Sequence, residues 1–167
     1  MISEKVQKAI NDQINAELWS AYMYLSMSAY FQNEGFAGFA NWMRIQFEEE
    51  KMHALKFFDY VNERGGKIEL QPIDKVPHTW KDAADAFRET YKHEQVVTAL
   101  IYGVMDVAIA EKDYATQSFL KWFIDEQVEE EASASDILTR IEMINGNGNG
   151  LFMLDRELLT RTLDPIE

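Results

Sequence analysis

Residues 43–57 read MRIQFEEEKMHALKF. Positions seven apart lie on nearly the same face of a helix, and this face is apolar at Met43 and Phe57 but carries Glu50 between them. His53 follows Glu50 by three residues, so the carboxylate and the imidazole lie one turn apart and can reach one metal ion. The stretch therefore predicts an amphipathic helix whose buried face carries metal-ligand side chains.

Three other segments repeat this pattern, with a polar side chain near the middle of an apolar stripe. No stripe carries a lysine or arginine at matching depth. A buried ionised carboxylate costs several kcal/mol unless it is paired, so a group of them needs cations nearby. We therefore predict a pair of metal ions, bound mainly by carboxylates together with one histidine. The stripes are Ile10, Ile14, Glu17, Ala21, Tyr24 and Phe31; Met43, Phe47, Glu50, Ala54, Phe57 and Val61; Phe87, Glu94, Ile101 and Ala108; and Leu120, Phe123, Gln127, Glu130, Ala134, Ile137 and Ile141.

Helical periodicity extends over four long segments, at about 3–33, 36–64, 79–111 and 114–144. Glycines follow the first two segments, and Thr79 with Asp82 has the spacing of a capping box at the start of the third. Tight turns join the first segment to the second and the third to the fourth. Each of these pairs is therefore expected to form an antiparallel hairpin.

The middle connection, at about 67–78, contains Pro72 and Pro77 and lacks helical periodicity. With its flanking residues, about 14 extended residues reach about 45–50 Å. A helix of about 30 residues is about 45 Å long. This match predicts one long crossover that leaves the second and third helices parallel.

The C-terminal part contains an Asn/Gly run at 145–150, which predicts a flexible hinge. Leucines at helical spacing then predict a short fifth helix at 151–163, which Pro165 ends. The expected fold class is all-α, a single domain over residues 1–167 with a long four-helix bundle at 3–144.

The composition narrows the partners and the kind of metal site. The chain has 167 residues, a net charge of −13 and 47% hydrophobic residues. Such a charge argues against nucleic acid and anionic membrane surfaces, and no apolar run is long enough to span a membrane. With no cysteine, ligands must be oxygen and imidazole, which suit iron, manganese, zinc, magnesium or calcium. The start lacks a signal-peptide pattern, so we expect a cytoplasmic protein.

Some polar residues fit a simpler interpretation. Glu48, Asp125 and Glu131 are expected on solvated faces, while His78 and His93 are expected to be structural. The aromatic and methionine side chains are expected in the core or at subunit contacts.

Taken together, Glu17, Tyr24, Glu50-x-x-His53, Glu94 and Gln127-x-x-Glu130 on four helices with a long crossover resemble a bacterial non-haem ferritin. The resemblance covers the whole chain, including the fifth helix. It implies a ferritin-like fold and an iron-storage ferroxidase. Such a protein oxidises Fe²⁺ with O₂ or H₂O₂ at a di-iron centre and stores the Fe³⁺ as a hydrous oxide mineral. The mineral lies inside a homo-oligomeric shell of twenty-four subunits.

The resemblance also implies roles for individual residues. Glu17, Glu50 and His53 would hold the first iron, Glu50 would bridge, and Glu94 and Glu130 would hold the second. Gln127 would be a nearby hydrogen-bond partner, and Tyr24 would be redox-active, supportive of the ligands or simply packed. A third iron site would use Glu49, Glu126, Glu129 and Glu130.

Departures from related families sharpen this interpretation. The fourth helix carries Gln127-x-x-Glu130 instead of a second E-x-x-H, so the second iron is expected to bind more weakly. No haem is expected, because Lys51 stands where bacterioferritins have their haem-ligating methionine. A non-storing di-iron or di-manganese oxidase, a peroxide-detoxifying enzyme and a metal-stabilised structural bundle stay as alternatives. Glu111 and Asp113 are either channel carboxylates or part of a plain solvated turn.

Overall fold

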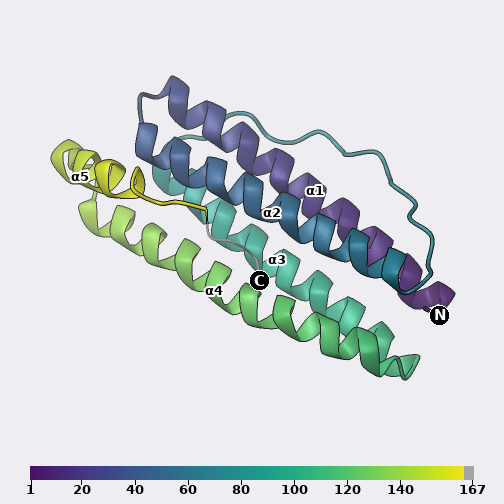
Figure 1. The fold of residues 1–167 in the computed structure, drawn as a ribbon. Coiled ribbons are helices and arrows are strands. Elements are labelled where there is room, and N and C mark those ends of the chain that lie inside the picture. Colours follow the sequence, from purple (N-terminus) through teal and green to yellow (C-terminus); the bar gives the residue numbers. More distant parts are fainter. Residues whose placement is uncertain (164–167) are drawn as a thin grey trace.

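Four long helices lie side by side and a short fifth helix lies across one end of them (Figure 1). The computed structural model describes residues 1–163, and within that range every element is helical. The helices are α1 (Glu4–Asn33), α2 (Ala37–Glu63), α3 (Ala83–Ala110), α4 (Tyr114–Ile144) and α5 (Gly148–Leu158). The predicted all-α bundle with a short C-terminal helix is therefore confirmed. None of the described helices combines the length and the apolar character that a membrane span requires.

The two hairpins are set by sharp helix ends. At the end of α1, Gly35 has a φ of 82°, and the Phe36 amide donates to the Phe31 carbonyl at 2.9 Å. This is the Schellman arrangement, in which a left-handed residue reverses the chain within a few residues. The same arrangement ends α3, where Lys112 takes the left-handed position with a φ of 54°. Each turn leaves too little chain for anything except an antiparallel neighbour.

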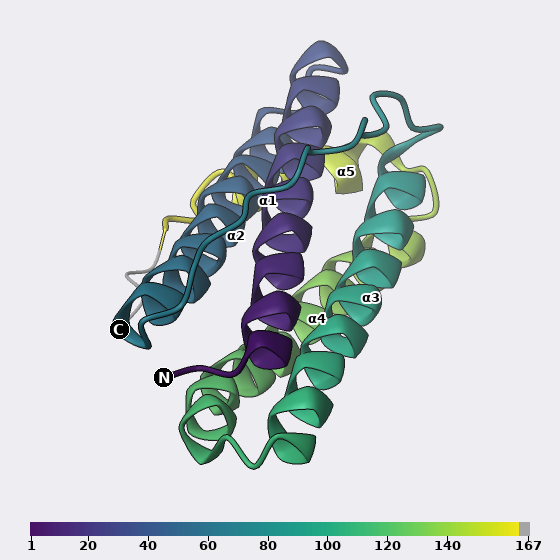
Figure 2. The same ribbon diagram turned by 90° about the vertical axis from the view of Figure 1, so that its right-hand side faces the viewer.

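The long connection between α2 and α3 runs back along the outside of α1 (Figure 2). Asn11 of α1 holds it twice: its amide donates to the Lys67 carbonyl at 2.9 Å, and its side-chain oxygen accepts from the Glu69 amide at 3.0 Å. Farther along, the Ser26 hydroxyl donates to the Pro77 carbonyl at 2.6 Å. The connection spans the bundle, so α2 and α3 run in the same direction as the crossover prediction requires.

Three predicted helix ends are wrong. The third helix begins at Ala83 instead of near Thr79, because the Asp82 carboxylate accepts from the Asp85 amide and is itself the N-cap. The fifth helix is Gly148–Leu158 instead of 151–163, because the Asn147 side chain accepts from the amides at 149 and 150 and starts the helix inside the expected hinge. The predicted stop at Pro165 lies outside the described residues.

Helix α5 docks onto the beginning of α2. Phe36, the N-cap residue of α2, offers no side-chain acceptor. Instead, one carboxylate oxygen of Asp155 accepts from the amides of Gly38 and Phe39 at 2.8 and 3.0 Å. A Cβ at position 38 would lie 1.6 Å from the Asp155 carbonyl oxygen, so only glycine permits this approach. The last helix thus supplies the cap that the second helix lacks.

The core consists of two apolar clusters with a polar layer between them. One cluster, near α5, includes Met27, Phe39 and Phe87. The other, near the opposite end, includes Ile10 and the stacked rings of Phe57 and Phe123, whose centres lie 3.9 Å apart. Along each long helix the predicted ligand residues fall between the two clusters. The polar layer comprises Gln13, Glu17, Ser20, Gln46, Glu50, His53, Glu94, Gln127 and Glu130.

Candidate metal centre

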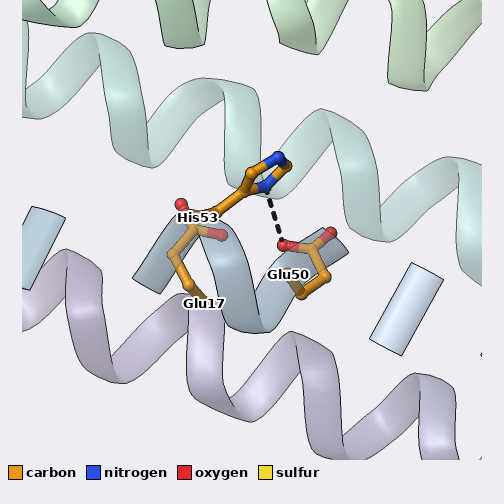
Figure 3. Close-up of side chains that lie close together, drawn as sticks. All are labelled: Glu17, Glu50 and His53. Carbon is orange, nitrogen blue, oxygen red and sulfur yellow. Dashed lines mark ion pairs between the residues drawn. The ribbon is translucent and has the colours of Figure 1, made fainter. Parts of the chain in front are cut away.

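Glu17 of α1 meets Glu50 and His53 of α2 in the middle of the bundle (Figure 3). Each offers one ligand atom, and these atoms lie within 4.8 Å of one another. The Nδ1 of His53 is 3.4 Å from one Glu50 oxygen. The three side chains are almost fully buried, with exposed fractions of 0%, 1% and 2%. The i, i+3 spacing of Glu50 and His53 therefore places both side chains on one buried face of α2, as the sequence predicts.

The other half of the centre comes from α3 and α4. The Glu94 carboxylate accepts hydrogen bonds from the Tyr24 hydroxyl and from the Gln127 amide, the latter at 3.2 Å. The Glu130 carboxylate accepts from the Gln46 amide at 2.9 Å. A second group of ligand atoms within 4.8 Å of one another comprises His53, Glu126 and Glu130. His53 thus belongs to both groups and links the two halves.

Burial and mutual repulsion change how these groups ionise. Burial, followed by the charges of Glu94, Glu17 and Glu130, raises the pKa of Glu50 well above its ordinary value. Burial, followed by the charge of Glu130, raises the pKa of Glu94 to about 8, although hydrogen bonds from Tyr24 and Gln127 oppose that rise. In a protein without cations, these raised pKa values favour the protonated form of both carboxyls.

Unsatisfied polar atoms face the middle of the centre. One oxygen of Glu17, both oxygens of Glu50 and the Nε2 of His53 are buried and have no hydrogen-bond partner within residues 1–163. Buried polar atoms are normally paired, and each unpaired one destabilises the fold. Three carboxylate oxygens and one imidazole nitrogen are donors of the kind that bind divalent metal ions such as iron, manganese or zinc. The site therefore fits metal cations on its chemistry and its unmet hydrogen-bonding capacity.

The four residues that the resemblance assigns to a third iron site do not form one group. Glu126 and Glu130 lie together beside His53, but Glu129 is exposed. Glu49 is engaged by the Arg161 guanidinium, whose Nη2 donates to its carboxylate at 2.6 Å. The described structure thus brings together Glu126 and Glu130 of this predicted set, whereas Glu49 is paired with Arg161.

Sequence reasoning missed two buried amides beside the centre. Gln13 donates to Glu17 at 2.8 Å, and Gln46 donates to Glu130. A signal for them exists, since Gln13 lies four residues before Glu17 and Gln46 lies four before Glu50, each on the same helix face. The signal is weak because glutamine carries no charge and alone does not indicate a metal site.

The remaining polar residues of interest have structural partners or lie in solvent. His93 shares a 2.7 Å hydrogen bond with the Ser20 hydroxyl, and burial lowers its pKa to about 4, while His78 is exposed. At the turn between α3 and α4, Glu111 pairs with Lys5 at 2.7 Å and Asp113 pairs with Arg64 at 3.1 Å. These two carboxylates tie neighbouring elements of the subunit together.

Comparison with known proteins agrees with this geometry. Residues 7–144 match the Ferritin-like domain family. The chain is 48% identical to the bacterial non-heme ferritin of Bacteroides fragilis (strain 638R), an alignment that covers 95% of this chain and 98% of that protein. It is 38% identical to the one from Staphylococcus aureus (strain MRSA252), over 98% of this chain and 99% of that protein.

Solved structures give the same result. An engineered closed form of the Archaeoglobus fulgidus ferritin superposes with a TM-score of 0.97 at 48% identity, covering 98% of this chain and 100% of that one. The open-pore ferritin of the same archaeon superposes with a TM-score of 0.96 at 49% identity, covering 97% and 100%. The fold, the buried carboxylates with one histidine and these near full-length matches place the chain in the ferritin family of iron-storage proteins.

Proposed function

We propose that this protein is a ferroxidase that oxidises Fe²⁺ at a two-metal centre and passes the Fe³⁺ on for storage. The observation that carries the proposal is the set of unpaired buried atoms on Glu17, Glu50 and His53, facing the hydrogen-bonded carboxylates of the other half. In a purely structural bundle, buried polar atoms without hydrogen-bond partners have no benefit, because each of them destabilises the fold.

In this proposal Glu17, Glu50 and His53 hold the first Fe²⁺. Glu50 bridges to a second Fe²⁺, which Glu94 and Glu130 hold. Two adjacent ferrous ions give two electrons to one O₂, which takes up two protons to form H₂O₂ and leaves two Fe³⁺. Hard carboxylate oxygens stabilise Fe³⁺ over Fe²⁺ and so favour this direction.

The raised pKa values of Glu50 and Glu94 give these carboxyls a second role. Each must lose its proton before it can bind a cation, so iron binding and proton release are coupled. Tyr24 and Gln127 donate to Glu94 and orient it toward the centre. Partners that orient metal ligands in this way commonly change metal affinity or activity by about 10–100-fold when they are removed.

The two halves of the centre differ in a way that suits a protein that passes iron on instead of one that retains it. The α3–α4 side contributes no histidine of its own, and its carboxylates already accept hydrogen bonds from Tyr24, Gln127 and Gln46. A cation there competes with those donors, so it binds more weakly and exchanges more readily. This weaker half is what favours storage over an oxidase that keeps its metals.

Storage also needs an enclosed space, and we propose a shell of twenty-four copies of this chain. Support comes from large apolar side chains left exposed on the single subunit. They gather near the end of α4 and on α5, at Met143, Phe152 and Met153, and on α1 and the crossover, at Tyr22 and Leu70. Exposed apolar groups of this size are typical of surfaces that other subunits cover.

One experiment separates this function from its alternatives. The purified protein receives Fe²⁺ without oxygen, air is then admitted, and ferric absorbance and particle size are followed. We expect fast oxidation and retention of many irons per chain in particles far larger than one bundle. Retention of only two or three irons per chain would instead indicate a non-storing oxidase, and elution at the mass of one bundle would exclude the shell.

A further inference from the structure

Thr98 of α3 lies against two residues of α4 that are one helical turn apart, Gln127 and Glu131. The Gln127 amide nitrogen lies 3.3 Å from the Thr98 hydroxyl oxygen, and that hydroxyl lies 2.6 Å from a Glu131 carboxylate oxygen. Gln127 is buried, whereas Thr98 and Glu131 are only partly buried. The three side chains therefore form a hydrogen-bonded chain from a buried amide beside the metal centre to a partly exposed carboxylate.

The direction of this chain follows from the number of protons available. A threonine hydroxyl has one proton and two lone pairs. A threonine inside a helix can donate that proton to the carbonyl four residues earlier, and here the Glu94 carbonyl oxygen lies 3.0 Å away. The Glu131 carboxylate lies closer, at 2.6 Å, and an ionised acceptor forms the stronger hydrogen bond. The hydroxyl proton therefore goes to Glu131, and the lone pairs of Thr98 are left to accept from Gln127.

This arrangement determines how the Gln127 amide is turned. A side-chain amide has two N–H protons at one end and a carbonyl oxygen at the other, and rotation by 180° exchanges them. The lone pairs of Thr98 require the nitrogen end. With one N–H directed to Thr98, the other reaches Glu94, whose Oε2 lies 3.2 Å from the amide nitrogen. In the rotated amide, an oxygen would face the Thr98 lone pairs and the Glu94 carboxylate, and both contacts would be repulsive.

We propose that Thr98 and Glu131 are positioning residues that act through Gln127 to hold the Glu94 carboxylate in the orientation that binds the second Fe²⁺. Glu131 fixes the hydroxyl proton of Thr98, Thr98 fixes the amide of Gln127, and the amide fixes one oxygen of Glu94. Hydrogen-bond partners behind a metal ligand orient it in this way. The inference rests on the proposed function, because it takes Glu94 as a ligand of the second metal ion.

The test is a calorimetric titration of the full-length assembled protein with Zn²⁺, which binds carboxylate and imidazole ligands without being oxidised. The titration counts the binding events and gives the affinity of each. Thr98→Val removes the hydroxyl and keeps the branched shape, whereas Thr98→Ser keeps the hydroxyl. Thr139→Val is the matched control, since the exposed Thr139 hydroxyl donates to the Ser135 carbonyl of its own helix at 2.9 Å. Thermal unfolding of each variant checks that it folds.

We expect Thr98→Val to weaken the second binding event about tenfold and to leave the first unchanged. Thr98→Ser and Thr139→Val should bind both ions like the unmodified protein. Glu131→Gln should weaken the second event by a smaller factor, since a neutral amide can donate to Thr98 as well as accept from it. In the Thr98→Val background, Glu131→Gln should have no further effect, because both residues act through the same chain.

Three results would overturn this inference and leave the ferroxidase standing, provided that the unmodified protein shows two binding events. An unchanged second event in Thr98→Val would show that the hydroxyl does not position Glu94. Equal weakening in Thr98→Ser would assign the effect to packing. A Glu131→Gln effect of the same size with and without the Thr98 hydroxyl would mean that the charge acts on the metal directly. If the unmodified protein shows no tight event at all, the metal centre itself is wrong and this inference falls with it.

Discussion

The two halves of the metal centre differ in how their polar atoms are satisfied. On the α1–α2 side, both oxygens of Glu50 and the Nε2 of His53 have no hydrogen-bond partner within residues 1–163, although one Glu50 oxygen lies 3.4 Å from the Nδ1 of His53. On the α3–α4 side, Glu94 and Glu130 accept hydrogen bonds from Tyr24, Gln127 and Gln46. A cation entering the first half satisfies atoms that were unpaired, whereas one entering the second half competes with existing bonds. The carboxylate of Glu50 is therefore free of hydrogen bonds and can bind a metal ion directly, whereas the carboxylates of Glu94 and Glu130 already accept hydrogen bonds.

Removing the carboxylate that is proposed to bridge the two halves should have the largest effect. Glu50→Ala takes away the proposed bridging carboxylate, so neither metal keeps its full ligand set. We expect the initial rate of ferric absorbance to fall by more than the about 100-fold that loss of a supporting hydrogen bond can cause. Glu48→Ala, on the same helix in an ion pair with Arg44, is the control. Unchanged iron oxidation by Glu50→Ala would show that this is not the site.

Removing a ligand from the hydrogen-bonded half alone should abolish the second metal site and leave the first intact. Glu94→Gln is expected to leave the first metal bound and to eliminate the second, so that anaerobic Zn²⁺ titration shows one tight event at the centre in place of two. Asp106→Asn, an exposed residue of the same helix, should behave like the unmodified protein. Loss of both events in Glu94→Gln would mean that the two halves are not independent.

Removing only the phenol donor should give a smaller effect. Tyr24→Phe deletes a hydrogen bond that lowers the pKa of Glu94, so that carboxyl holds its proton more tightly. We expect an oxidation rate about tenfold lower at neutral pH. The acid limb of the pH–rate profile should move to higher pH. Tyr22→Phe, an exposed tyrosine on the same helix, is the matched control. An unshifted acid limb would leave Tyr24 with a packing role only.

The smallest effect concerns the metal-free protein. The pKa of Glu94 is about 8 when folded, above the ordinary carboxyl value of 4.5, so between these values the folded state binds more protons than the unfolded state. The contribution of this group to stability is therefore lost as the pH rises from about 4.5 to about 8. Glu94→Gln cannot ionise, so its Tm should exceed that of the unmodified protein by a few degrees at pH 8 and by less at pH 5. A difference in Tm that does not depend on pH would contradict the raised pKa.

The sequence predicts the fold well because its strongest signals are periodic and repeated. Four apolar stripes with central carboxylates determine the helices, and a proline-containing segment of the right length predicts the crossover. The start of α3 was misplaced because Thr79 and Asp82 both offer capping chemistry, and only the structure shows that Asp82 is used. Arg161 could not be predicted at all, since nothing near it in the sequence indicates that it reaches Glu49, 112 residues away.

For the centre, the stripes indicate which residues are buried, and the structure adds which of them meet. Glu17, Glu50 and His53 gather as the helical spacing suggests, because two of them share one turn of α2. Their hydrogen-bond partners could not be assigned from spacing alone, since Gln46 donates across the bundle to Glu130 and not to Glu50 on its own helix. Pairings between helices depend on rotation and depth, which periodicity does not specify.

The carboxylate of Asp155 that caps α2 has a consequence for how the chain is made. A ribosome delivers Gly38 and Phe39 long before residue 155, so the first turn of α2 emerges without the acceptor that holds its amides in the finished protein. That turn lacks this cap until α5 has been synthesised and has folded back onto it. A nascent chain stalled before residue 155 therefore carries a second helix whose first turn has no side-chain cap.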